Sequence, residues 1–208
     1  MLQPLVDEFP DLPEYRNQLA HAHDGLATVL GGLGRRLEAS KYDRLAVEQW
    51  EILAARFPER EEYRVRLVEC LSYVRFLIDP STPPDADALY LAEKWVALVP
   101  DDPWAWNTLA WVHYLSGDYR AAVGDVVQSH ASEPDLTDEN LLLRAMATWK
   151  AGNKEEARAL FEGVAKSMDA RGAQDKDLRR CRADAAQLLG IDEKPPDEKE
   201  KPDEPSPP

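Results

Sequence analysis

The sequence predicts an all-α protein: a right-handed α-solenoid of about four helix pairs, closed by a capping helix and followed by a disordered tail. Three observations support this fold class. The segment "DEFPDLPEYRNQLA" at 7–20 returns as "ARFPEREEYRVRLV" at 55–68, 48 residues later. Side chains recur at helical spacing, as Trp106, Leu109 and Ala110 do. No segment shows the sustained apolar–polar alternation that is typical of strands. Repeated helical units predict a solenoid.

Turn signals separate the helices. Two related segments, "SGDYRAA" and "AGNKEEA", lie 35 residues apart near the C-terminal end. In each, we expect the glycine (Gly117, Gly152) to end one helix and the next residue (Asp118, Asn153) to cap the following one. Proline-marked turns recur along the chain, at residues 9–10, 57–58, 99–100 and 133–134.

The helices that these signals delimit form pairs. We predict helices at 14–30, 36–56, 61–78, 86–98, 103–115, 118–131, 138–150, 153–168 and 175–189. The first eight make four repeats, at about 14–56, 61–98, 103–136 and 138–170. The domain is therefore expected to span 1–190.

The last predicted helix differs from the others because it has one apolar stripe and is otherwise polar. A solenoid must end with a polar outer face, so we interpret 175–189 as the cap. The stripe consists of Leu178, Cys181, Ala185 and Leu188. Beyond it, residues 191–208 are acidic, rich in proline and almost free of apolar residues, which predicts a disordered tail.

The charge of the chain limits its partners. It carries 25 basic against 39 acidic residues, a net charge of −14. Nucleic-acid and anionic-membrane binding need clustered basic residues, so both are disfavoured, and a neutral to basic protein or peptide is the expected partner. There is no run of apolar residues long enough for a membrane span and no signal-peptide pattern, so we expect a cytoplasmic protein.

Residues 106–134, "WNTLAWVHYLSGDYRAAVGDVVQSHASEP", carry a family resemblance. The Trp with Leu-Ala three and four residues on, the "GDY" turn, a small residue in the second helix and the closing Pro together resemble the tetratricopeptide repeat. Residues 138–170 are similar but lack the leading aromatic and the closing Pro. The segment "FPDLPEYRNQLAHAHDGLATVLGGLGR" resembles the repeat tails of planctomycete-type bacterial proteins, often attached to a Ser/Thr kinase domain.

The resemblance implies a protein-interaction scaffold that binds a peptide or helix in its concave groove. The alternative is a regulatory C-terminal region of a larger bacterial kinase or other enzyme. Aligned at 48 residues, Leu5 and Phe9 match Leu53 and Phe57 at the end of a long helix. We therefore expect the chain to be the C-terminal part of a longer architecture.

No catalytic signature occurs in the sequence. The nucleotide-binding glycine motifs, the zinc-protease and serine-hydrolase motifs and the kinase triplets are all missing, so we expect no enzyme activity and no cofactor. His21 and Asp24 lie at i, i+3 and could share a metal, but two ligands on one helix are a weak signal, and we predict no metal site. Cys70 and Cys181 are interpreted as free, buried thiols.

The resemblance also predicts which residues line a binding groove. In the repeat family one stripe of each first helix lines the concave surface, and aromatic side chains there suit a protein interface. Trp104 and Trp111 either line this groove or pack against the neighbouring repeat. The full set of expected groove residues is Phe76, Trp104, Asn107, Trp111, Tyr114, Glu139, Leu142, Met146 and Trp149.

Overall fold

The computed structural model describes residues 2–79, 82–132, 137–172 and 175–191. Within these ranges every regular element is helical, which confirms the predicted all-α class. In order they are α1 Gln3–Glu8, α2 Pro13–Gly32, α3 Arg36–Arg56, α4 Glu61–Ser72, the 3₁₀ helix η1 Tyr73–Phe76, α5 Ala86–Leu98, α6 Pro103–Ser116, α7 Tyr119–Ser132, α8 Asp138–Lys150, α9 Lys154–Arg171 and α10 Lys176–Leu189.

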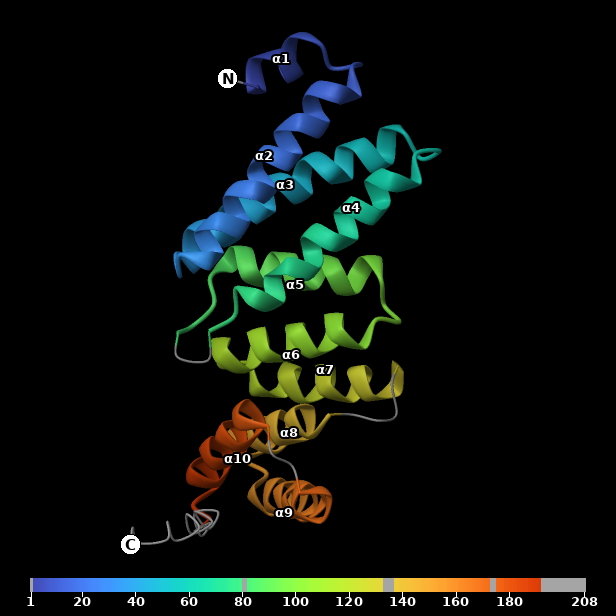
Figure 1. The fold of residues 1–208 in the computed structure, drawn as a ribbon. Coiled ribbons are helices and arrows are strands. Elements are labelled where there is room, and N and C mark those ends of the chain that lie inside the picture. The colour runs from blue at the N-terminus through green and yellow to red at the C-terminus, as the bar shows by residue number, and fades with distance from the viewer. Residues whose placement is uncertain (1, 80–81, 133–136, 173–174, 192–208) are drawn as a thin grey trace, which may run out of the picture.

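The helices stack along one long axis as pairs that are adjacent in sequence (Figure 1). α2 packs on α3, α4 on α5, α6 on α7 and α8 on α9, and each pair also contacts the next. α10 closes the stack by packing on α8 and α9. At the other end α1 contacts α2 and buries Val6. None of the described helices combines the length and apolar character needed to cross a membrane.

The sequence predicted helix 61–78 to be continuous, and this is wrong. α4 ends at Ser72, whose hydroxyl bonds back to the Glu69 carbonyl, and the chain continues as the 3₁₀ turn η1. A hydroxyl that competes for a helical carbonyl favours such a change. The tighter turn places Arg75 and Phe76 at the surface that becomes the groove.

The turn signals are confirmed in part. Gly117 and Gly152 both have positive φ, 87° and 101°, as helix-ending glycines do. Asp118 caps α7 by accepting from the Ala121 amide at 3.1 Å. Asn153 does not cap α9 in this way, because its side-chain amide donates to Glu156 instead.

Two large apolar clusters fill most of the stack, and a third, small one lies where α2, α3 and the end of η1 meet. The N-terminal core lies between α2 and α6 around Trp50, Trp95 and Leu71, each at most 2% exposed. The C-terminal core lies between α6 and α10 around Phe161 and Leu142. α6 contributes to both clusters, so it joins the two halves of the molecule.

The predicted tail, 191–208, lies outside the described residues apart from Ile191, and the expected repeat end at 133–136 lies outside them too.

Candidate partner-binding groove

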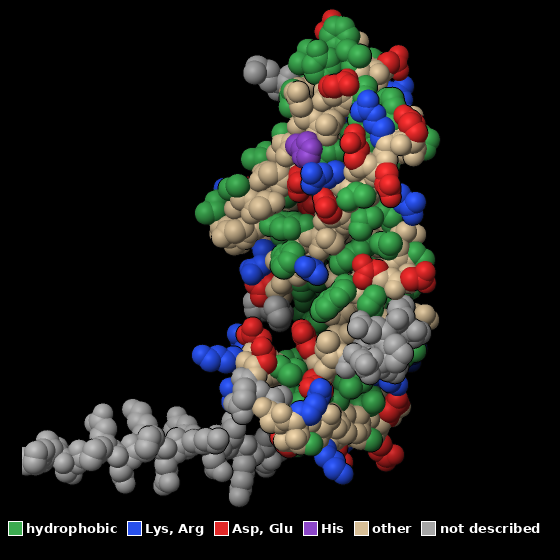
Figure 2. All heavy atoms as spheres, turned by 45° about the vertical axis from the view of Figure 1, so that its right-hand side comes forward, with side chains coloured by type: hydrophobic (Ala, Val, Ile, Leu, Met, Phe, Trp, Pro, Cys, Tyr) green, Lys and Arg blue, Asp and Glu red, His purple; other side chains and the backbone are tan. Residues whose placement is uncertain are grey.

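A cavity of about 1240 Å³ opens beside α6. η1 and the residues after it form one wall, α8 contributes part of the lining, and α10 forms the opposite wall. The surface is hollowed in the lower half of Figure 2, where acidic and hydrophobic side chains border the opening. We call this cavity the groove.

Aromatic side chains dominate one end of the groove. Phe76 is 60% exposed and Trp104 is 51% exposed. The Arg75 guanidinium lies 4.5 Å from the centroid of the Phe76 ring and 5.9 Å from that of Trp104. Such a cation over two rings forms a platform with both apolar area and positive charge. Because both rings are largely exposed, packing in the core does not account for the presence of aromatic residues at these positions.

Further along α6, Trp111 and Tyr114 are half-buried and meet edge to face, with ring centroids 6.0 Å apart. Both line the groove while also packing on the C-terminal core. The two alternatives for the tryptophans are therefore resolved differently: Trp104 lies open in the groove, whereas Trp111 contacts both groove and core. Burial, together with Tyr119, Cys181 and Asp184, raises the pKa of Tyr114 to about 12.

The other end of the groove is acidic. Glu139, Asp177 and Asp184 line it, and none of them forms an ion pair with another described residue. Although the Glu139 side chain is exposed overall, partial desolvation followed by repulsion from Asp175 and Asp177 raises its pKa. Burial and the same field of carboxylates raise the pKa of Cys181 to about 12. Arg180 of α10 and Lys150 of α8 also line the groove, so the three carboxylates leave an excess of one negative charge. That excess favours a cationic group.

Asn107 lies at the floor of the groove between these ends. Its residue is 9% exposed, and its Oδ1 has no hydrogen-bond partner among the described residues. An unpaired buried amide oxygen is unusual in a folded protein and leaves an acceptor beside the groove.

The structure brings together seven of the nine residues expected from the sequence: Phe76, Trp104, Asn107, Trp111, Tyr114, Glu139 and Met146. Two expectations are wrong. Leu142 is fully buried in the C-terminal core, and the Trp149 ring lies beside Lys154 and Arg158 of α9 rather than in the groove lining.

The error has a simple helical cause. On α8 the groove-facing stripe runs through Glu139, Met146 and Lys150, at i, i+7 and i+11. Leu142 and Trp149 are also seven apart, but each follows that stripe by three residues. Three residues advance a helix by about 300°, which is a net offset of about 60°, so the second stripe lies beside the first and faces the core and α9.

The contribution of α10 to the groove was not predicted from the sequence. It was expected to act only as a cap, yet its polar side supplies a full wall of the groove, through Asp177, Arg180, Cys181, Asp184, Gln187 and Leu188. The sequence does contain a pattern that indicates a shared face, because these residues recur at three- to four-residue spacing. Ala185 and Leu189, which are buried in the C-terminal core, lie next to the groove-facing side of α10.

No protein-family model matches the sequence, and no curated protein matches it. Among solved structures the chain is similar to TTC0263, a thermophilic TPR protein of Thermus thermophilus. The two are 22% identical, the alignment covers 89% of this chain and 87% of the other, and the TM-score is 0.45.

Proposed function

We propose that this protein is a protein-interaction scaffold that binds a short segment of a neutral to basic partner in the groove. The observation that carries the proposal is the groove itself, with exposed aromatic rings at one end and, at the other, carboxylates that form no ion pair with any described residue. Large, rigid aromatic side chains provide contact area with few rotamers to freeze, and such residues dominate binding energies at protein interfaces.

The two ends suit different parts of one bound segment. An apolar side chain of the partner would pack on Trp104 and Phe76. A Lys or Arg farther along would lie near Glu139, Asp177 and Asp184, where opposite charge gives specificity and faster association. If the same helical stack were attached to a catalytic domain, as in a kinase, it would bind its partner through this groove in the same way.

The test begins with capture of partners from cell lysate on the wild type and on Trp104→Ala/Trp111→Ala, followed by titration of the purified partner. We expect the double variant to weaken binding by about 2 kcal/mol or more, roughly 30-fold in Kd. Trp149→Ala is the matched control, since it also removes an indole but outside the groove lining, and it should bind as the wild type does.

Helical content measured by circular dichroism must be unchanged in all variants used for the comparison. Equal binding by the wild type and by a folded double variant would place the binding surface elsewhere on the molecule. The charge contribution is tested separately with Glu139→Gln/Asp184→Asn, which should slow association and reduce its dependence on salt.

A further inference from the structure

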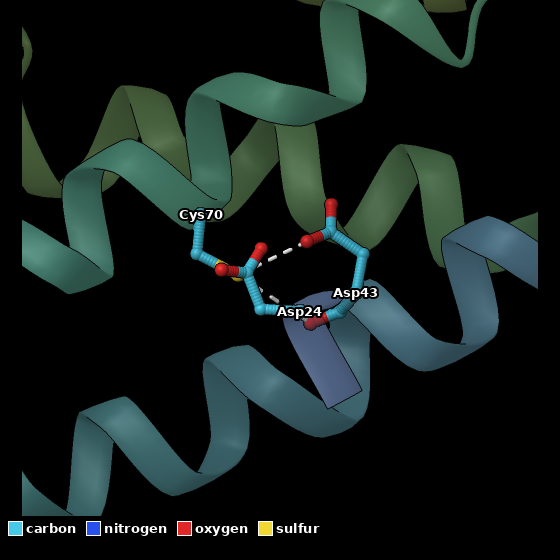
Figure 3. Close-up of side chains that lie close together, drawn as sticks. All are labelled: Asp24, Asp43 and Cys70. Carbon is cyan, nitrogen blue, oxygen red and sulfur yellow. Dashed lines mark hydrogen bonds between the residues drawn. The ribbon is translucent and has the colours of Figure 1, made fainter. Parts of the chain in front are cut away.

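A separate cluster of polar side chains lies inside the N-terminal part of the stack, and none of its residues lines the groove. Asp24 comes from α2, Asp43 from α3 and Cys70 from α4, and one potential ligand atom of each lies within 4.8 Å of the other two. Figure 3 shows the three side chains converging between the helices. Asp43 Oδ1 and Cys70 Sγ are 3.0 Å apart and share a hydrogen bond.

Burying the polar side chains of this cluster without a compensating charge costs free energy. Asp43 is 0% and Cys70 4% exposed, and Asp24 is half-buried. The second carboxylate oxygen of Asp43, Oδ2, has no hydrogen-bond partner among the described residues. A buried acid with an unpaired oxygen is expected only where something compensates for its lost hydration.

No described cation supplies that compensation. His21 and Arg66 are near enough to favour the ionised form of Asp24, but neither forms an ion pair with it or with Asp43. The ring of His21 packs against Trp50 instead, with centroids 4.9 Å apart, and Arg66 pairs with Glu69. Burial, and to a lesser extent the charge of Asp24, raise the pKa of Asp43 to about 7.

We propose that Asp24, Asp43 and Cys70 bind one Zn²⁺ ion, with water at the remaining position on the half-exposed Asp24 side. A thiolate among the ligands favours zinc over magnesium or calcium, which prefer oxygen alone. Zn–S and Zn–O distances of about 2.3 and 2.0 Å put tetrahedral ligand atoms roughly 3.5 Å apart. The observed spread within 4.8 Å therefore needs only small side-chain rotations.

Binding changes protons in a defined way. The Cys70 thiol loses its proton when sulfur bonds to the ion, and any proton on Asp43 leaves at the same time, both to solvent. The divalent charge then neutralises two of the three negative ligands. The ion would tie α2, α3 and α4 together, which stabilises the folded chain by mass action.

The full chain, freed of metal with a chelator and then dialysed, is titrated with Co²⁺ and afterwards with Zn²⁺. We expect one equivalent of Co²⁺ to produce sulfur-to-cobalt charge-transfer absorption, Zn²⁺ to displace it, and Zn²⁺ to raise the Tm. Cys70→Ser should abolish the absorption, whereas Cys181→Ser, which removes the other thiol, should retain it. Absorption that persists in Cys70→Ser, or that never develops in the wild type, overturns the proposal.

Asp24→Asn provides the decisive variant if changes at the buried positions prevent folding. Asp24 is half-buried and its charge repels Asp43, so the amide should not lower the Tm of the metal-free protein, while it should weaken Co²⁺ binding at least tenfold. Wild-type affinity in Asp24→Asn would contradict the three-ligand site. Loss of partner binding in the groove variants does not bear on this test, because those residues lie outside the cluster.

Discussion

Gly31 is a residue of α2 at which even one methyl group lacks room. A Cβ built there would lie 2.5 Å from Tyr73 Oη and 3.3 Å from Leu77 Cδ2, so it would collide with the turn that follows α4. At Gly25, on the same helix, a Cβ would have nothing within 4 Å. A comparison of the same substitution at the two glycines therefore distinguishes the effect of close packing from that of helix propensity.

We predict that Gly25→Ala raises the free energy of unfolding by about 0.5 to 1 kcal/mol, because alanine loses less backbone entropy in a helix. Gly31→Ala should instead lower it by about 1 kcal/mol through overpacking. Urea denaturation of both variants measures the difference. Adding Tyr73→Phe to Gly31→Ala removes the hydroxyl nearest the new methyl and should restore most of the loss. Equal effects at the two glycines would contradict the close approach.

The two helix starts at Asp118 and Asn153 occupy equivalent places 35 residues apart but work differently. Asp118 accepts from the Ala121 amide, while Asn153 makes no capping bond to the backbone. We predict that Asp118→Ala costs about 1 kcal/mol of stability and that Asn153→Ala costs only a few tenths. The negative charge of Asp118 at a helix N-terminus adds to the difference. Thermal denaturation compares the pair, and a larger loss for Asn153→Ala would show that its bond to Glu156 matters more than capping.

Helix positions followed from the sequence because each one depends on local features. The glycines at helix ends and the spacing of apolar residues defined α5, α6, α8 and α10 within about one residue of the observed bounds. The end of α4 was missed, because a 3₁₀ turn has the same local composition as a helix. Side-chain capping was also misjudged at Asn153, since a nearby Glu offered a competing partner.

Site residues were harder to predict, because facing directions depend on packing between helices. On α6, the predicted residues Trp104, Asn107 and Trp111 do line one cavity, and their role in binding remains a prediction. On α8, the groove-facing stripe and the stripe of Leu142 and Trp149 are neighbours, and the packing of α8 on α9 decides which of them is buried. The cluster of Asp24, Asp43 and Cys70 joins three helices, so no spacing within one helix revealed it.

The stack as a whole has two large cores, which meet at α6. Leu109 and Val112 belong to the N-terminal core, and Ala110 belongs to the C-terminal core. Contacts in such an array join mainly neighbouring helices, so stability is close to a sum of local terms. The groove spans the junction, because its walls come from η1 on one side and α10 on the other. A bound segment would therefore couple the two halves.

This arrangement predicts that damage to one core remains local. Phe161→Ala, at a position 2% exposed in the C-terminal core, should speed amide hydrogen exchange in α8 to α10 far more than in α2 to α4. Leu71→Ala, 1% exposed in the N-terminal core, is the matched variant and should do the reverse. Native-state exchange followed by mass spectrometry resolves these regions. A uniform rise in exchange along the chain, from either variant, would show that α6 couples the two cores into a single cooperative unit.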